Sequence, residues 1–567
     1  MTTRGVGGGA NARTWIARFV VAAPTIIGVV VAASLWTKPW TPVGDWAAMW
    51  LRADDVFTVH TPLTGAYSTH NWNHPGPSIF WVVWALKRLS WNSVPRAFAL
   101  MAVVNGLTLS ATVVAARRWF GNAEALATAL IAVLIAHSLG GRELGDFWNP
   151  YPPVVWLFAF AVGVIAIASR RRPQAWTWTI VFGSLAAQAH LSFLFLVVVL
   201  AVAATIGAWI SRSEERGPKV PRGPVIAILT VFWLPVVIDT LFVTRNVDRI
   251  RRYLTLTHQQ LGLPDAMHLL GREYALWGPL VVGGQPTGFG GVTAASTLWL
   301  LPAGVIGVAM VAAAVSRAPA RVYVVPALAL AGVSPFLAAG LEGFLFVYLV
   351  TFLVAAAAVF FWLALMTIVS FDAVPHAAVR AVGVVAIAAV VVVSAVWEPR
   401  NAQLPQQTWA PIIRTASAQF RARVGAPRRP IVVDYLDDED GIVAPGIIAT
   451  LAERYDVHTL DGSARLHKWG YVRGELPSRP YNAYTIIPVY PNGNLSPQNS
   501  CVLALHPHTV VATSALTPAQ NKEYKALQLA NLITHAKLPR GEAARLNSLA
   551  DRSTQVFIVE GLFRQTC

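Results

Sequence analysis

The stretch WTWTIVFGSLAAQAHLSFLFLVVVLAVAATIGAWI (residues 176–210) contains no Lys, Arg, Asp or Glu, and its length constrains the fold. A transmembrane helix needs about 20 apolar residues to cross about 30 Å of hydrocarbon, so this stretch is too long for one helix. Gln188 and His190 lie near its middle. We therefore predict two helices, over 176–189 and 191–210, with this polar pair at the turn between them. Polar groups at membrane depth are commonly functional or internally paired.

Apolar runs of this kind recur through the first two-thirds of the chain. Hydrophobic residues make up 55% of the sequence and charged residues 13%, which indicates a membrane protein rather than a soluble globule. We therefore expect an α-helical polytopic membrane protein with about 11 spans. Beyond the two helices above, the runs cover residues 14–36, 97–116, 122–140, 152–169, 224–243, 294–316, 321–340, 344–369 and 378–397.

The short apolar segment 77–92, PSIFWVVWALKRLSWN, decides the orientation of every later span. If it does not cross, the short basic loops share the cytoplasmic side with the N-terminal tail, residues 1–13. Cytoplasmic loops are enriched in Lys and Arg, so we predict a juxtamembrane or re-entrant helix here. These loops also explain the formal net charge of +16 better than nucleic-acid binding does. They contain Arg117 and Arg118, Arg170–Arg172, residues 211–223, residues 316–321 and Arg380.

Residues 398–567 differ in composition from the predicted membrane domain, residues 14–397. Charged residues and prolines return, and the apolar runs become shorter. The predicted topology makes this region an extracytoplasmic α/β domain. Its two cysteines, Cys501 and Cys567, leave a disulfide open. Strands are expected over 430–436, 456–460, 484–490, 501–505 and 554–560, and helices over 444–455 and 517–535.

The first outer loop, residues 41–77, is rich in ionisable and aromatic side chains. Asp45 lies in GDWAAMW, where a carboxylate at the mouth of a membrane cavity can deprotonate an acceptor hydroxyl or, equally, cap a helix. Asp54 and Asp55 are candidates for contacting a substrate or a metal, and a solvated helix end is the alternative for at least one of them. His74, in HNWNHPGP, is held by two neighbouring prolines and can face a phosphate or a sugar.

The second outer loop, GGRELGDFWNPYPP (residues 140–153), carries a further group of polar and aromatic candidates. Arg142 can pair with a phosphate and Asp146 can bind a sugar hydroxyl, whereas a local ion pair is the simpler alternative. Trp148 and Asn149 belong to the WNPYPP segment. The tryptophan suits either a carbohydrate-stacking surface or the aromatic belt of a membrane interface.

The third outer loop, TRNVDRIRRYLTLTHQQ (residues 244–260), is basic on the side that the topology places outside. This departs from the charge bias of the other loops. Arg245, Arg249, Arg251 and Arg252 are therefore candidates for holding a lipid-linked phosphate, since guanidinium groups match phosphate oxygens. Contact with ordinary lipid headgroups explains them equally well.

Several other chemistries do not fit the spacing of the residues. LDDEDG (residues 436–441) fails the calcium-loop template because Leu436 occupies the first ligand position. The histidines of the first loop lack zinc-ligand spacing, and no cysteine lies near them. A P-loop, a dinucleotide fingerprint and a nucleophile elbow do not occur where they could function.

The order of these motifs resembles the GT-C class of membrane glycosyltransferases, in particular cell-envelope members from actinobacteria. A first span is followed by an outer loop with Asp45 near its start, then by HPGP (residues 74–77), and then by WNPY (residues 148–151) before a later span. The resemblance covers roughly residues 14–400. A juxtamembrane helix in the first outer loop is also a feature of this class, in agreement with the interpretation of residues 77–92.

The resemblance implies a plasma-membrane enzyme that transfers a sugar, of the arabinofuranose or mannose class, from a polyprenyl-phosphate donor. The acceptor would be a cell-envelope glycan or glycolipid, and the anomeric carbon would be inverted. It implies Asp45 as the catalytic base. Trp46 follows where members of the class carry a second carboxylate, so a divalent cation, Mg²⁺ or Mn²⁺, stays open as a cofactor. The predicted substrate-binding residues are Asp54, Asp55, His74, Arg142, Asp146, Trp148, Asn149, Gln188, His190, Arg245, Arg249 and Arg252.

Two other classes of function are compatible with the sequence. A transporter or flippase for a lipid-linked sugar would carry polar residues within several spans. A non-catalytic envelope assembly protein would depend on the C-terminal domain rather than on Asp45.

Overall fold

The computed structural model divides the chain into two compact units, and each is described by itself. Unit 1 comprises Met1–Lys38 and Leu63–Gln403, and unit 2 comprises Pro39–Pro62 and Leu404–Cys567. The structure describes residues 7–563 except for 69, 170–172, 212–219, 257–259, 284–294, 342–346, 372–375, 406–408, 426–428, 436–441, 460–476, 479, 490–495, 514–517, 534–540, 543–544, 547–548 and 550–554.

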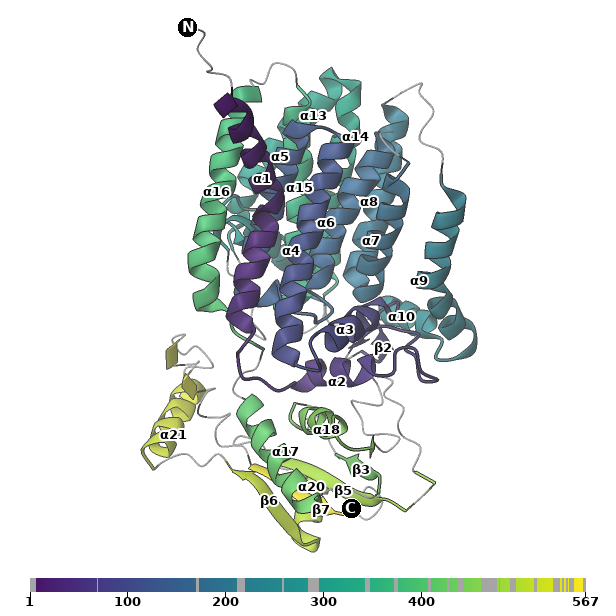
Figure 1. Cartoon of the computed structure of the whole chain (residues 1–567), viewed down its shortest axis with the longest axis vertical. Helices are drawn as coiled ribbons and strands as arrows, with labels where there is room; N and C mark the ends of the chain where they lie inside the picture. The colour runs from purple at the N-terminus through teal and green to yellow at the C-terminus, as the bar shows by residue number, and fades with distance from the viewer. Residues whose placement is uncertain are drawn as a thin grey trace. The chain divides into compact units, whose positions relative to one another are not determined.

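Unit 1 is a bundle of long apolar helices, whose ribbons run side by side in Figure 1. A two-stranded antiparallel hairpin, β1 (Tyr67–Ser68) and β2 (Trp72–Asn73), precedes the short helix α3 (Ser78–Leu89). The 3₁₀ turns η1 (Thr297–Leu300), η2 (Ala318–Ala320) and η3 (Val347–Val350) lead into α13, α14 and α15. The remaining helices are α1 (Gly7–Leu35), α4 (Val94–Trp119), α5 (Asn122–Glu143), α6 (Pro152–Ala168), α7 (Ala175–Ala189), α8 (Leu191–Ile210), α9 (Arg222–Phe242), α10 (Asn246–Thr255), α11 (Leu263–Glu273), α12 (Pro279–Val282), α13 (Leu301–Ser316), α14 (Arg321–Ala339), α15 (Thr351–Val369) and α16 (His376–Asn401).

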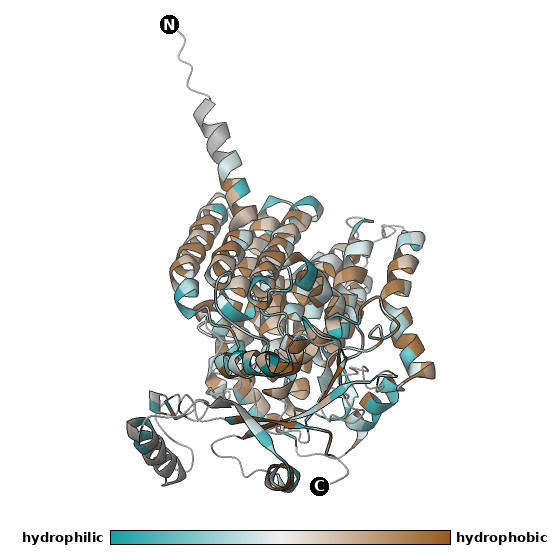
Figure 2. Ribbon diagram, turned by 60° about the horizontal axis from the view of Figure 1, so that its bottom comes forward, coloured by the Kyte–Doolittle hydropathy of each residue, from teal (hydrophilic) through white to brown (hydrophobic). Residues whose placement is uncertain are grey.

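The chain is a helical multi-pass membrane protein. Within the described ranges, nine helices are long and apolar enough to span a bilayer. The described part of each predicted apolar run contains one α-helix, but α6 and α7 have only 17 and 15 residues, so the number of spans stays a prediction. In Figure 2, which colours the ribbon by residue hydropathy, the long helices of unit 1 are mostly brown to pale, with teal concentrated near their ends. On α9 most of them are exposed, as expected for a surface that faces lipid.

The predicted break in residues 176–210 is confirmed. Helix α7 ends at Ala189 and α8 begins at Leu191. His190, between them, has an extended backbone, with φ −152° and ψ 134°. The charge-based interpretation of residues 77–92 agrees with the length of α3, whose 12 residues reach only about 18 Å.

Helices α5, α6 and α15 form the centre of unit 1, since most of their side chains are buried. Small residues allow close packing around them. Gly28 on α1 and Gly106 on α4 face one another's backbone, where a Cβ would clash. The hydroxyl groups of Thr25 and Ser110 are 2.7 Å apart across the same helix pair.

Unit 2 combines a five-stranded sheet with helices. The strand order is β4-β3-β5-β7-β6, with β3 parallel to β4 and β5, and β7 antiparallel to β5 and β6. The elements are α2 (Gly44–Ala53), α17 (Ala410–Val424), β3 (Ile431–Asp434), α18 (Ala444–Ala452), β4 (Val457–His458), β5 (Asn482–Val489), α20 (Pro497–Leu505), β6 (His508–Thr513), α21 (Pro518–Ile533) and β7 (Gln555–Glu560).

The predicted strand over 501–505 is wrong, because these residues belong to α20. Ser496 accepts a hydrogen bond from the backbone N–H of Asn499, and Pro497 occupies the first turn. Both features start a helix, and the apolar residues Val502 and Leu503 then pack on the sheet from that helix. The strand that follows, β6, was not predicted.

Unit 2 also contains residues 39–62, which the sequence analysis assigned to the membrane domain. Helix α2 packs against α18, and its Trp46 and Trp50 are 1% and 0% exposed. The N–H of Gly44 donates to the carbonyl of Ile442 (2.9 Å), and the indole N–H of Trp40 donates to the carbonyl of Pro405 (2.7 Å). Unit 2 is therefore built from two parts that are far apart in the sequence.

Cys501 on α20 is disulfide-bonded. The chain has only one other cysteine, Cys567, which lies outside the described residues, as does the acidic segment 436–441.

Candidate functional site

The three carboxylates of the first loop all lie on or next to α2, in unit 2. Asp45 occupies the first turn of the helix and is half-buried, and a carboxylate in this position is favoured by the helix dipole. No side chain caps the helix at Val43. Asp54 is the C-cap residue. The structure thus places Asp45 and Asp54 at opposite ends of a ten-residue helix.

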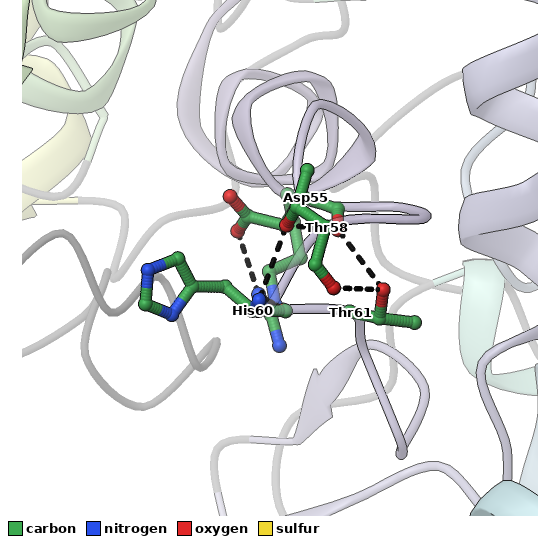
Figure 3. Close-up of polar contacts among 5 residues, drawn as sticks. Asp55, Thr58, His60 and Thr61 are labelled. Atoms are coloured by element: carbon green, nitrogen blue, oxygen red, sulfur yellow. Dashed lines mark hydrogen bonds and ion pairs between the residues drawn. The ribbon is translucent and has the colours of Figure 1, made fainter.

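Asp55 makes hydrogen bonds within the turn that follows α2. Its carboxylate accepts a hydrogen bond from Arg52 at 2.6 Å, and the same guanidinium donates to the carbonyl of His60 at 2.8 Å. Thr58 and Thr61 tighten this turn through their hydroxyl groups, as Figure 3 shows. These contacts support a structural role for Asp55, since its ion pair is almost completely buried.

In unit 1, the end of α5 and the loop after it form a buried polar group. Arg142, Glu143, Asp146 and Tyr151 are between 0% and 5% exposed. Glu143 interacts electrostatically with Arg142 and Asp146, and Tyr151 interacts with all three. Among the described residues, no hydrogen-bond partner is found for Arg142 Nε, Glu143 Oε1 or the Tyr151 hydroxyl. Buried polar atoms without partners are rare, and a ligand is one explanation for them.

The helix break in α5 positions the residues of this polar group. Gly140 has φ 67° and ψ −163°, a backbone conformation that favours glycine, and it turns the last residues of α5. The N–H of Trp148 donates to Asp146 Oδ1 at 2.8 Å, which fixes the loop. Burial, and then the Glu143 carboxylate, raise the pKa of Tyr151 well above its ordinary value. Tyr151 is therefore a neutral hydroxyl donor.

Aromatic rings line the same loop. Trp148 lies 4.6 Å from Tyr348 and 6.0 Å from Tyr151, measured between ring centroids. Thr351, at the start of α15, donates to the carbonyl of Pro150 and anchors the loop. Such rings can stack on a sugar or fill the interior, and their position beside unpaired polar atoms favours a ligand surface.

His74, Gln188 and His190 meet in a second buried group. The rings of His74 and His190 stack at a centroid distance of 4.4 Å. His74 Nδ1 accepts a hydrogen bond from the backbone N–H of Leu191. Gln188 accepts from the N–H of Ser78 and donates to the carbonyl of Phe232, so this side chain ties α3, α7 and α9 together.

Both histidines are neutral. Burial, and then repulsion by the charge that His190 carries when protonated, lower the pKa of His74 well below its ordinary value, and burial lowers the pKa of His190 to about 4. The two polar groups of unit 1 are adjacent, because the amide of Asn149 donates to the carbonyl of Ala189, between Gln188 and His190. The structure thus brings together six predicted residues, namely His74, Arg142, Asp146, Asn149, Gln188 and His190, with Trp148 beside them.

The predicted arginines of the third loop lie on a different kind of surface. Helix α10 is held by Asn246, whose side chain makes two hydrogen bonds to the backbone of Asn73, and by the buried side chain of Ile250. Arg245, Arg249 and Arg252 are exposed. They are therefore available to lipid headgroups and do not belong to the buried polar group.

Sequence reasoning missed several members of the buried group. Glu143 and Tyr151 were not among the predicted substrate-binding residues. His137 and Glu398, whose side chains meet between α5 and α16, and Tyr348 were not considered. A lone ionisable residue within an apolar run is a usable signal, and it would have identified His137 in the run 122–140, whereas Glu398 lies just beyond the run 378–397.

Across the described ranges, no group of three His, Cys, Asp or Glu side chains could hold a metal ion. The buried carboxylates Glu143 and Asp146 lie beside Arg142, which already offsets their charge. These residues do not form a metal site by themselves.

Comparison with known proteins adds no assignment. No protein-family model matches the chain, and no curated protein matches it significantly.

Proposed function

We propose that the protein is a membrane glycosyltransferase that moves a sugar from a polyprenyl-phosphate donor to an acceptor of the cell envelope. In the reaction, an acceptor hydroxyl attacks the anomeric carbon while the bond from that carbon to the phosphate oxygen breaks. The polyprenyl phosphate leaves with the electron pair, and a base takes the hydroxyl proton. The sugar is of the arabinofuranose or mannose class.

The roles follow from the chemistry of each side chain. Asp45 is assigned as the base on the resemblance to GT-C enzymes, where a carboxylate at this position has that role. Arg142 is assigned to the donor phosphate, because a buried guanidinium forms strong charge-assisted hydrogen bonds with phosphate oxygens. Trp148 and Tyr348 offer rings to the sugar. A divalent cation, Mg²⁺ or Mn²⁺, stays open as a cofactor.

One observation supports this proposal most directly. Arg142 Nε, Glu143 Oε1 and the Tyr151 hydroxyl are buried without partners among the described residues, at the end of membrane helix α5. Each unpaired buried group costs about 1–3 kcal/mol, and a polar ligand that pairs with all three would remove this cost. A phosphate and a sugar supply the acceptors and hydroxyls that these groups need.

Two further observations support an extracytoplasmic location for the reaction. The short basic loops favour one side of the membrane, which puts the 140–153 loop on the other. The disulfide at Cys501 suits an oxidising compartment.

The test is transfer of radiolabelled sugar from a polyprenyl-phosphate donor in membranes that contain the protein. Asp45→Asn is expected to lower the rate by at least about 10²-fold, the usual contribution of a general base. Asp265→Asn is a matched control, because Asp265 is an exposed carboxylate in the first turn of a short helix, α11. Undiminished transfer by Asp45→Asn at normal expression would remove the base role.

A transporter of lipid-linked sugars is the second candidate. It is favoured by the buried pair of His137 and Glu398 on two membrane helices, since ionisable residues at such positions mark ion or proton pathways in transporters. Proteoliposomes separate the two functions. Movement of the lipid-linked sugar between leaflets without any transfer to acceptor would support the transporter.

A further inference from the structure

Unit 1 contains a groove of about 920 Å³ between α4 and α7. Both helices pack against α6, and the groove lies where the end of α4 approaches the start of α7. Its lining comes from the last turns of α4, from Gln174 and from the first turns of α7.

The groove is separate from the buried polar group described above. The amide of Asn105 on α4 donates to the carbonyl of Leu144, in the loop of that group. Arg118 lies thirteen residues further along the same helix, which corresponds to about 20 Å at about 1.5 Å per residue. The groove therefore lies toward the opposite end of the bundle, beside the basic loop that the charge bias assigns to the cytoplasm.

The lining changes from polar to apolar along the groove. Arg118, Gln174 and Thr177 lie at the helix ends, whereas Val114, Ala111, Val181 and Phe182 lie deeper along the two helices. Trp119 and Trp178 meet edge to face at 5.9 Å, and the indole N–H of Trp178 is fixed on the carbonyl of Ala159 at 2.8 Å. Tryptophans at such a boundary are typical of the membrane interface.

The neighbouring arginines Arg117 and Arg118 differ in their hydrogen bonding. Arg117 donates to Asn122 Oδ1 at 3.0 Å. Arg118 lines the groove, is exposed, and makes no ion pair or hydrogen bond with the described residues. The N-terminal end of α7, with its partial positive charge, lies at the same mouth of the groove. The mouth is thus positive, and the floor is apolar.

We propose that this groove binds an anionic diacyl phospholipid of the cytoplasmic leaflet. The phosphate would lie against Arg118 and the start of α7, and one acyl chain would occupy the apolar floor. A positive mouth above an apolar channel complements such a lipid and offers no comparable advantage to a zwitterionic one.

The experiment measures the thermal midpoint of the purified full-length protein in mixed micelles that contain either dioleoylphosphatidylglycerol or dioleoylphosphatidylcholine. Phosphatidylglycerol is expected to raise the midpoint in a saturable way, with a much weaker effect from phosphatidylcholine. Arg118→Gln should weaken the apparent affinity for phosphatidylglycerol about tenfold, because a charge-assisted contact is lost. Arg117→Gln is the matched control and should leave the affinity unchanged.

A second variant tests the apolar floor without changing charge. Ala111 is exposed at the groove, so Ala111→Trp fills the space and should remove the effect of phosphatidylglycerol. Equal stabilisation by both lipids, or equal affinities for Arg118→Gln and Arg117→Gln, would overturn the proposal. An unchanged response of Ala111→Trp would overturn the placement of the acyl chain.

Discussion

His137 on α5 and Glu398 on α16 are joined within the membrane domain, with Nδ1 and Oε1 3.1 Å apart. The two side chains are 4% and 1% exposed, and Ser394 Oγ lies 3.0 Å from the same ring nitrogen. Gly283 approaches the other side of the imidazole so closely that a Cβ would clash with Nε2. The histidine is therefore fixed from both sides.

We predict that Glu398→Ala destabilises the protein by about 3–5 kcal/mol, because it removes one partner of a buried pair. Glu398→Gln keeps a hydrogen-bond acceptor and should cost clearly less. Thermal unfolding in detergent measures both, with Asp265→Asn as an exposed control. Equal midpoints for the alanine variant and the wild type would show that the pair does not stabilise the bundle.

Tyr151→Phe tests whether the hydroxyl of Tyr151 binds substrate or is only buried. If the hydroxyl binds substrate, sugar transfer should fall about tenfold, while the protein stays equally or more stable because an unpaired polar atom is gone. Tyr274→Phe is the matched control, since that hydroxyl lies 3.0 Å from Ser334 Oγ. Its loss should lower stability without the specific loss of transfer. Full transfer by Tyr151→Phe would contradict the proposed role.

The stacked histidines predict acid sensitivity of unit 1. The pKa of His190 is about 4 in the folded protein, below its ordinary value of 6.5, so the unfolded chain binds more protons between these values. The contribution of neutral His190 to the free energy of unfolding is fully present above pH 6.5 and is lost as the pH falls toward 4. The loss in the free energy of unfolding over this pH range is on the order of 3 kcal/mol.

The measurement is the thermal midpoint from pH 7.5 to pH 4.5 for the wild type and for His190→Phe. The phenylalanine keeps a ring against His74 and cannot titrate, so the variant should show a smaller decline. A decline as steep as that of the wild type would assign the acid sensitivity to other groups.

Helix α2 is expected to be essential to unit 2. Residues 404–567 expressed alone should fail to fold, because α2, which packs against α18, is then missing. Fusing residues 39–62 to this segment through a flexible linker should restore a folded unit, seen as dispersed NMR signals. Trp46→Ala in the fusion should cost about 3–5 kcal/mol. A folded segment 404–567 without α2 would contradict this.

Much of the fold followed from length and hydrophobicity. The uncharged stretch 176–210 had to break, and the break lies at the predicted His190. The strand predicted at 501–505 failed because short apolar runs suit a strand or a buried helix equally, and Ser496 with Pro497 decides for a helix. These two capping residues were the overlooked signal.

The candidate site was predicted less completely. Arg142, Asp146 and Asn149 were selected because they share one loop, and Gln188 and His190 because they interrupt an apolar run. Their proximity, through the Asn149 to Ala189 hydrogen bond, could not be predicted because it depends on how α6 and α7 pack. The grouping of residues 39–62 with residues 404–567 also could not be predicted from the sequence, because it depends on long-range contacts of α2.

The discontinuity of unit 2 has a consequence for biosynthesis. The ribosome makes α2 early, but its partner α18 follows only after about 390 further residues, on the order of 20–80 s later at about 5–20 residues per second. During that interval α2, which carries Trp46 and Trp50, lacks the helix against which it packs. The nascent chain must therefore keep an apolar helix from aggregating while the membrane helices are inserted, which makes this step a natural point for chaperone assistance.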